Sequence, residues 1–204
     1  MDKLQPNYFT IYRPTEEVLI KIKKSKFLSY AYPVQNEEQC NRLLALLRDK
    51  HKNANHVCYA YRLKKNEKHK YSDDGEPKNT AGFPIYGQLL SKELQNTLIA
   101  VVRYFGGVKL GSGGLVQAYK QSASAAIENT QIIPLIEFCN AEVQCRIKDY
   151  DRVFHIISTF KAQILEKKIS QSCELKVRVQ ENKFESFREH LTQLYPTKTI
   201  LLLD

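Results

Sequence analysis

The stretch Leu98-Ile99-Ala100-Val101-Val102, followed by Gly106-Gly107-Val108-Lys109-Leu110-Gly111-Ser112-Gly113-Gly114, decides how the first two thirds of this 204-residue chain fold. The continuous apolar run has the length and the branched side chains of a strand that is buried on both faces. Five glycines in nine positions then form a loop, and small residues follow at Ala118, Ser122 and Ala126. Their spacing by four predicts a helix over 115–128 that packs closely on a sheet.

The glycine loop has two interpretations. Glycines let a backbone approach a ligand closely, and the N-terminus of the following helix presents free N–H groups to an anion. With the positive charges beside the loop, the candidate anion-binding residues are Arg103, Gly106, Gly107, Lys109, Gly111, Gly113 and Gly114. The alternative is that the glycines only permit a tight crossover and close packing between helix and sheet. The loop matches neither GxxxxGK[ST] nor GxGxxG, so it is neither of these nucleotide-binding motifs.

Segments before the loop alternate between strand and helix patterns. Apolar periodicity predicts strands over 18–22, 26–34 and 57–63, a helix from Asn36 to about residue 50, and a helix with Pro84 in its first turn. Asn36 has the character of an N-cap, and Gln39 completes a capping-box pattern. Residues 64–80 are polar and predict a long loop or a hairpin plus a loop.

Residues after the loop change in pattern. Asn129–Pro134 breaks the helix and contains a proline, which indicates a linker. Strands over 138–147, 163–169, 173–179 and 199–203 and helices over 150–160 and 184–194 then give the order βαββαβ. That order predicts a ferredoxin-like sandwich over 136–204. The sequence therefore predicts an α+β protein with two α/β sandwich domains, residues 1–133 and 136–204.

Positive charge is concentrated in the first domain. The chain has a net charge of +9; residues 1–135 carry 20 Lys and Arg against 12 Asp and Glu, a net of +8. Such asymmetry indicates an anionic partner, namely nucleic acid such as RNA, the ribosome or an acidic protein surface, or else a charge that serves solubility alone. Lys64, Lys65 and Tyr71 belong to a stretch of interleaved basic and aromatic residues, a mixture that favours single-stranded nucleic acid. The alternative is that these aromatic residues face the core while the lysines are solvated.

An acidic turn, Ser72-Asp73-Asp74-Gly75-Glu76-Pro77, is the second candidate site. The carboxylates of Asp73, Asp74 and Glu76 could hold Mg²⁺, cap a turn or offset neighbouring lysines. His56 and Cys58 share a strand face as a conceivable base and nucleophile, but the sequence offers no evident carboxylate to orient them. A structural histidine is the alternative.

Five cysteines without CxxC spacing indicate free thiols in a reducing compartment rather than a disulfide framework or a zinc ribbon. The run Leu98–Val102 is far shorter than the ~20 residues of a membrane helix. The N-terminal residues Met1–Pro6 contain no apolar signal segment. We therefore expect a cytoplasmic protein without a membrane partner.

Several motifs together resemble the IMPACT family, whose bacterial members are called YigZ-like. They are His56–Tyr61, Ser72–Pro77, Thr80–Gly82 and Arg103–Leu115, and Ser25-Lys26-Phe27 is similar to the start of the family pattern. The chain departs from that pattern at Lys78-Asn79 and Phe83. The resemblance implies an IMPACT-type N-terminal domain similar to a domain shared by a small-subunit ribosomal protein and elongation factor G, and a ferredoxin-like C-terminal domain. It also implies a link to translation, because eukaryotic relatives regulate translation through an activator of an amino-acid-starvation kinase.

These observations favour a translation-associated protein that binds RNA or the ribosome, has no catalytic residues and needs no cofactor. Two alternatives remain open: a Mg²⁺-dependent enzyme that acts on a phosphate-bearing substrate, and a protein–protein adaptor. The sequence does not indicate an oligomeric state.

Overall fold

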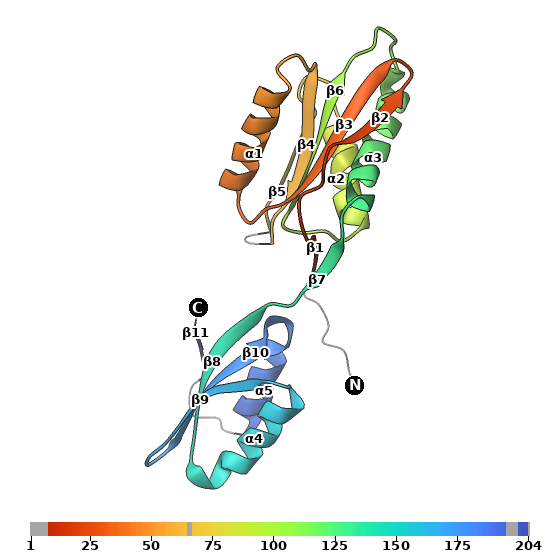
Figure 1. The fold of residues 1–204 in the computed structure, drawn as a ribbon. Coiled ribbons are helices and arrows are strands. Elements are labelled where there is room, and N and C mark those ends of the chain that lie inside the picture. Colours follow the sequence, from red (N-terminus) through yellow and green to blue (C-terminus); the bar gives the residue numbers. More distant parts are fainter. Residues whose placement is uncertain (1–7, 65–66, 195–199, 204) are drawn as a thin grey trace. The chain divides into compact units, whose positions relative to one another are not determined.

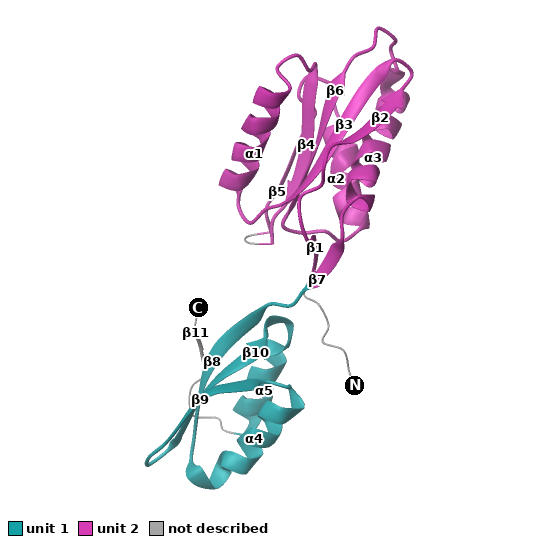
Figure 2. Cartoon of the chain, in the orientation of Figure 1, with its two compact units in different colours: residues 1–7, 135–204 teal, residues 8–134 magenta. Residues whose placement is uncertain are grey.

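The computed structural model describes residues 8–64, 67–194 and 200–203, and this part contains five α-helices and three β-sheets (Figure 1). The protein is therefore a mixed α+β protein, as its sequence predicts. The chain divides into two compact units (Figure 2). Residues 8–134 form the first unit, and the described residues from 135 onward form the second.

A five-stranded sheet in the order β2-β3-β6-β4-β5 forms the centre of the first unit. Its strands are β2 (Val18–Ile22), β3 (Ser25–Pro33), β4 (His56–Arg62), β5 (His69–Ser72) and β6 (Thr97–Tyr104). Helix α1 (Glu37–Lys50) covers one face of this sheet, and α2 (Gly82–Ser91) and α3 (Gly111–Glu128) cover the other (Figure 1). The first unit is thus a three-layer arrangement with an apolar core on each side of the sheet.

The central strand β6 contributes to both cores. Leu98, Ala100 and Val102 belong to the core under α1, whereas Ile99 and Val101 belong to the core under α2 and α3. All five side chains are fully buried. The prediction that this apolar run is a strand buried on both faces is confirmed.

The start of α1 follows its sequence signature. The Asn36 side chain accepts a hydrogen bond from the Gln39 backbone N–H at 2.9 Å, and the Gln39 side chain accepts one from the Gln35 N–H at 2.8 Å. The first bond satisfies a backbone N–H that a helix leaves open in its first turn, and the second holds the residue before the cap. The predicted N-cap is confirmed.

Two parts of the first unit differ from the sequence prediction. Helix α3 begins at Gly111 rather than at 115, so three of the loop glycines lie in its first turn. Residues 132–135 form strand β7 (Ile132–Leu135), which pairs with β1 (Tyr8–Ile11) in a two-stranded sheet. The sequence predicts a linker at 129–134, because this segment breaks the preceding helix and contains Pro134. An edge strand tolerates a proline, which hides the strand from sequence reasoning.

The second unit has the order β8-α4-β9-β10-α5-β11, which is the predicted βαββαβ order. Its elements are β8 (Phe138–Cys145), α4 (Tyr150–Thr159), β9 (Gln163–Ile169), β10 (Cys173–Gln180), α5 (Phe184–Leu194) and β11 (Ile200–Leu203). The antiparallel sheet has the order β11-β8-β10-β9, and side chains from β8 and β10 share one core with α4 and α5. In the described part of the chain, no helix combines the length and the apolar character needed to cross a bilayer.

Candidate functional site

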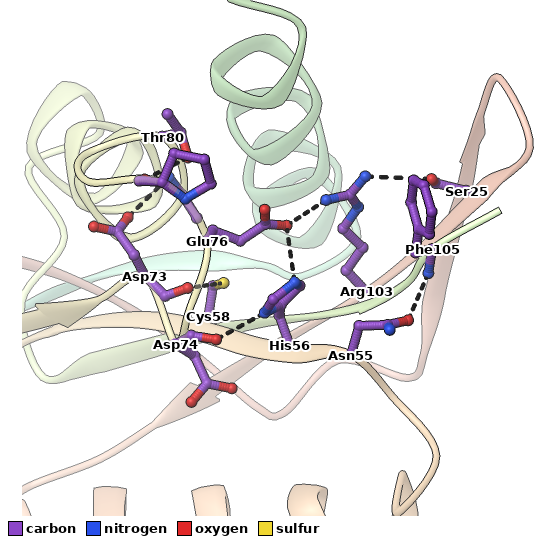
Figure 3. Close-up of polar contacts among 12 residues, drawn as sticks. Ser25, Asn55, His56, Cys58, Asp73, Asp74, Glu76, Thr80, Arg103 and Phe105 are labelled. Carbon is purple, nitrogen blue, oxygen red and sulfur yellow. Dashed lines mark hydrogen bonds and ion pairs between the residues drawn. The ribbon is translucent and has the colours of Figure 1, made fainter. Parts of the chain in front are cut away.

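A buried polar cluster lies where the acidic turn meets the end of β6 (Figure 3). The Glu76 carboxylate accepts hydrogen bonds from the Arg103 guanidinium at 2.6 Å and from the Tyr119 hydroxyl at 2.7 Å. The side chains of Arg103 and Glu76 are 6% and 4% exposed. Two opposite charges taken out of water together are stable only when each is paired, and here each neutralises the other.

Arg103 is therefore a structural residue at this position. Its guanidinium carbon lies 5.5 Å from the Phe27 ring centre and 5.4 Å from the Phe105 ring centre, and its other terminal nitrogen lies 3.5 Å from the Ser25 hydroxyl. The sequence suggested this arginine as a contact for an anion. In the structure Glu76 already matches its charge, and burial removes it from the surface that a ligand would reach.

The other two carboxylates of the acidic turn also hold the fold together. Asp73 accepts hydrogen bonds from the backbone N–H groups of Asn79, Ala81 and Gly82, which begin α2. It caps that helix from a distance, as negative groups do at helix N-termini. Asp74 accepts a bidentate pair of hydrogen bonds from Arg48.

Separate partners thus occupy the three carboxylates that the sequence offered as Mg²⁺ ligands. Across residues 8–64, 67–194 and 200–203, no group of three or more His, Cys, Asp and Glu side chains is placed to hold a metal ion. The acidic turn acts as a junction that ties α1, α2 and β6 to β4.

The pKa of Asp74 depends on these contacts. Burial acts to raise it, but the hydrogen bonds from Arg48 and from the Val57 N–H outweigh burial and hold the pKa below its usual range. Because the folded-state pKa lies below the unfolded value of about 3.9, this carboxylate stabilises the fold above that pH. Its contribution is lost as the pH falls from there through the folded-state pKa.

We expect Asp74→Asn to lower the free energy of unfolding at neutral pH, with the difference from the unchanged protein shrinking as the pH falls below about 4. Urea unfolding between neutral pH and about pH 3 measures this. Asp49→Asn is the matched control, because the Asp49 side chain is highly exposed in its pair with Lys52. A deficit for Asp74→Asn that persists unchanged at low pH would contradict the assignment.

His56 and Cys58 lie beside the cluster on β4. The His56 Nδ1 atom is 2.7 Å from the Asp74 carbonyl oxygen, so it carries the proton and donates it, and Nε2 lies 3.8 Å from the Glu76 carboxylate. Sequence reasoning found no carboxylate near His56, and the structure shows that Glu76 is this carboxylate. The Cys58 thiol donates to the Asp73 carbonyl at 3.0 Å, and burial raises its pKa far above that of a reactive cysteine. This arrangement describes a structural histidine and an unreactive thiol.

The glycine loop packs against the β2–β3 turn. A Cβ atom on Gly106 would lie 1.8 Å from the Lys24 carbonyl oxygen, so only glycine allows this approach. The Gly106 N–H donates to the Ser25 hydroxyl at 3.3 Å, and the Phe105 N–H donates to the Asn55 side chain at 2.8 Å. Gly107 and Gly111 have φ of +84° and +73°, which glycine adopts readily. Close packing thus accounts for Gly106, and the tight crossover accounts for Gly107 and Gly111.

Neither a close backbone contact nor a positive φ requires glycine at positions 113 and 114. A Cβ atom on Gly113 would meet nothing within 4 Å, and one on Gly114 would meet only the Leu110 side chain, at 3.1 Å. Both lie in the first turn of α3, where no side chain caps the helix and no acidic residue is present. The backbone N–H groups of that turn therefore lie beneath an open surface.

Exposed lysines lie at the same end of the sheet as this open helix end, and sequence reasoning missed most of them. The register pairs Lys26 with Tyr104, so the β2–β3 hairpin and the glycine loop lie at the same end of the sheet. Lys21 and Lys26 are direct cross-strand neighbours on the α1 face of the sheet, because Ile22 and Phe27 beside them pack on the α3 face. The β2–β3 turn adds Lys23 and Lys24, and Lys24 lies against Gly106. We call the following set the lysine–glycine surface: Lys21, Lys23, Lys24, Lys26, Phe105, Lys109 and the first turn of α3, Gly111–Gly114.

The lysine–glycine surface is unneutralised and partly aromatic. Within the described part of the chain, none of its five lysines forms an ion pair. Like charges directly opposite in a sheet, such as Lys21 and Lys26, destabilise it. The Phe105 side chain, which precedes the glycine loop, is 44% exposed. The sequence does contain a signal for this surface, which is the presence of four lysines within residues 21–26.

The remaining candidates from the sequence lie elsewhere. Lys64 follows β4 at the opposite end of the sheet, where Arg62 pairs with Thr97, the first residue of β6. Lys65 lies outside the described residues. Tyr71 lies on the edge strand β5 and is 39% exposed. The structure therefore does not bring Lys64 or Tyr71 together with the glycine loop.

Tyr71 belongs to a row of aromatic rings, some stacked and one edge-on, along the edge strand of the sheet. Its ring centre lies 5.8 Å from that of Phe83 and 5.7 Å from that of Tyr86, and Tyr86 stacks in turn on His69 at 5.0 Å. Side chains alternate along a strand, so Lys70 points to the opposite face, where Lys68 pairs with Glu37. The basic and aromatic residues interleaved in the sequence are thus separated in space.

Comparison with known proteins agrees with the motifs. Residues 23–127 match the family model of the Impact N-terminal domain. The chain belongs to the IMPACT family. The matched residues include the acidic turn, the buried Glu76–Arg103 pair and most of the lysine–glycine surface. The resemblance identified from the sequence is thereby confirmed.

Some relatives of this IMPACT family chain are similar over nearly its whole length, and others over about half of it. The IMPACT family member YvyE of Bacillus subtilis is 33% identical over 192 residues, which are 92% of this chain and 87% of that protein. The IMPACT family member YigZ of Escherichia coli is 35% identical over 113 residues, 54% of this chain and 55% of that protein. A crystal structure of a hypothetical protein is 26% identical, covers 98% of both chains and has a TM-score of 0.61.

Proposed function

We propose that this protein is a translation-associated regulatory protein that binds RNA or ribosomal particles through the lysine–glycine surface. The observation that carries the proposal is the set of five exposed lysines without ion-pair partners at the end of the sheet where α3 begins with an uncapped, glycine-rich turn. Phosphate groups are recognised by lysines and by helix N-termini, and bases stack on exposed aromatic rings such as Phe105.

Family membership supports the link to translation, because the IMPACT resemblance implies that eukaryotic relatives are translation regulators. The charge supports RNA as the partner, since the first two thirds of the chain carry a net +8. The Mg²⁺-dependent enzyme has less support, because the three carboxylates it would need are engaged with separate protein partners. A protein that presents an acidic surface could bind the lysine–glycine surface in place of RNA.

We also propose the division into an IMPACT-type domain, residues 1–133, and a ferredoxin-like domain, residues 136–204. Two compact units and the βαββαβ order of the second support it. The similarity of the first domain to that of a ribosomal protein and elongation factor G stays a prediction. In this proposal the first domain carries the contact with RNA.

We expect the triple variant Lys23→Gln/Lys24→Gln/Lys109→Gln to bind single-stranded RNA or ribosomal particles more weakly than the unchanged protein. In a plot of the logarithm of the binding constant against the logarithm of the salt concentration, each phosphate contact on a single strand contributes ~0.7 to the steepness of the slope. The loss of three contacts should therefore make the slope shallower by about 2. A salt titration of binding by the full-length chain measures both effects. Phe105→Ala should weaken binding without changing the salt dependence if a base stacks there.

The matched control carries the same change of charge elsewhere in the first unit. Lys52→Gln/Lys92→Gln/Lys120→Gln removes three exposed lysines that lie outside the lysine–glycine surface. We expect this control to bind nearly as the unchanged protein does. Equal weakening by both triple variants would mean that net charge alone drives binding, and absence of binding at low salt would remove RNA as the partner. Binding to an acidic protein that the first variant abolishes would favour the adaptor instead.

A further inference from the structure

Two cysteines lie directly opposite each other in the second unit. Cys145 is the last residue of β8 and Cys173 is the first residue of β10, and the two are register partners in the antiparallel ladder. Opposed residues of antiparallel strands place their side chains on the same face of the sheet. Both side chains are buried in the core that contains Val153 and Phe187. Two thiols therefore face each other within a single apolar core.

We propose that Cys145 and Cys173 form a reversible disulfide when the protein meets a small-molecule disulfide such as oxidised glutathione. A thiolate of the pair attacks one sulfur of the oxidant, which forms a mixed disulfide and releases one reduced thiol. The second cysteine, as its thiolate, then attacks the protein sulfur of the mixed disulfide and releases the second reduced thiol. Overall the two cysteines lose two protons and two electrons, and the oxidant gains them as it becomes two thiols.

The ladder geometry indicates why the bond would be reversible. The Glu181 N–H donates to the Glu137 carbonyl at 2.9 Å, which makes that opposed pair a hydrogen-bonded one. Such pairs alternate along an antiparallel ladder, so Cys173 and Cys145 also form a hydrogen-bonded pair. Their Cα atoms are then ~5.5 Å apart, which a disulfide accepts, but their Cβ atoms must approach by about 1 Å. Positions at strand ends allow this movement, and a strained bond is more easily reduced.

Burial sets the rate of the reaction. Burial, followed by the neighbouring Cys173 thiol, raises the pKa of Cys145 to about 11, so little thiolate is present at neutral pH. Oxidation therefore needs local opening of the strand ends and becomes faster at higher pH. The other cysteines have no partner thiol in register. Cys40 and Cys58 lie in different cores of the first unit, and Cys139 lies opposite Val179.

The test uses the full-length native protein, incubated with oxidised glutathione at about pH 8.5, where a free thiol is half ionised. Excess glutathione is removed, free thiols are alkylated after unfolding, and the peptides are mapped by mass spectrometry. We expect the number of free thiols to fall from five to three. The missing pair should be one intramolecular bond between Cys145 and Cys173, and dithiothreitol should restore all five.

Matched variants locate the effect. Cys139→Ser, on the same strand, should still lose two thiols, whereas Cys145→Ser should form no intramolecular bond. Glutathione adducts on the pair without a bond between them, or a bond that joins other cysteines, would overturn the proposal. If all five thiols remain, the incubation is repeated in a denaturant concentration that leaves the circular dichroism unchanged but speeds local opening. Five free thiols under those conditions would also overturn it.

Discussion

Glu76→Ala is expected to lower the free energy of unfolding by about 3–5 kcal/mol, because it leaves the Arg103 charge buried and unpaired. The pair is joined at 2.6 Å with both side chains almost fully buried, and the same carboxylate also accepts the Tyr119 hydrogen bond. Urea unfolding followed by circular dichroism measures the change. This loss is a large share of the ~5–15 kcal/mol by which a typical domain is stable.

A surface ion pair provides the matched control for this prediction. Glu38→Ala removes the partner of Arg42 in a pair that is 84% exposed on the glutamate side, and such pairs contribute about 0–1 kcal/mol. The double variant Glu76→Leu/Arg103→Met removes both buried charges, and we expect it to be more stable than Glu76→Ala. A loss below ~1 kcal/mol for Glu76→Ala, or a double variant that is less stable than the single one, would contradict a buried, mutually neutralised pair.

Gly106→Ala is the second change with a large expected effect. The new methyl carbon would lie 1.8 Å from the Lys24 carbonyl oxygen. Because that oxygen belongs to the backbone, it cannot move away as the end of a flexible side chain can. We expect a loss of stability at or above the upper end of the ~1–3 kcal/mol that overpacking usually costs. Urea unfolding of the variant measures this loss, and the contact between the glycine loop and the β2–β3 turn accounts for it.

Gly113→Ala is the control from the same loop. The position is open and helical, and alanine is more favourable than glycine by ~0.8–1 kcal/mol within a helix, so stability should stay unchanged or rise. Equal stability of the two alanine variants would refute the packing role of Gly106. Gly113→Ala with normal stability but weaker RNA binding would place the ligand against the first turn of α3.

Local signals in the sequence predicted the elements of the fold well. The apolar run of β6, the Asn36 cap and the apolar periodicity of α4 and α5 each depend on residues close together in the chain, and the structure contains all of them. The sequence did not predict strand β7, because β7 pairs with β1, which lies at the opposite end of the first unit in the sequence. Such pairing leaves no periodic pattern in a four-residue strand that contains a proline.

The candidate site was harder to predict, because its chemistry depends on partners distant in sequence. The sequence marked Arg103 as a charge available to a ligand, and only the fold reveals Glu76 beside it. It marked the loop glycines as one set, although Gly106 serves a close contact and Gly113 does not. It grouped Tyr71 with nearby lysines, yet strand alternation places Lys70 on the other face of the sheet.

The cross-strand contact between Lys21 and Lys26 gives dissolved salt two opposite effects on this protein. Mobile ions screen the repulsion between the two ammonium groups, so we expect this pair to destabilise the hairpin less as ionic strength rises. The same ions compete for the phosphates of a bound polyanion and loosen that complex. A polyanion bound over the hairpin would neutralise these two charges. Without such a ligand, the repulsion between them is strongest in buffer of low ionic strength. The purified protein should therefore be kept at moderate ionic strength, and the ionic strength should be lowered only after a polyanionic ligand has been added. This consequence rests on the positions of Lys21 and Lys26.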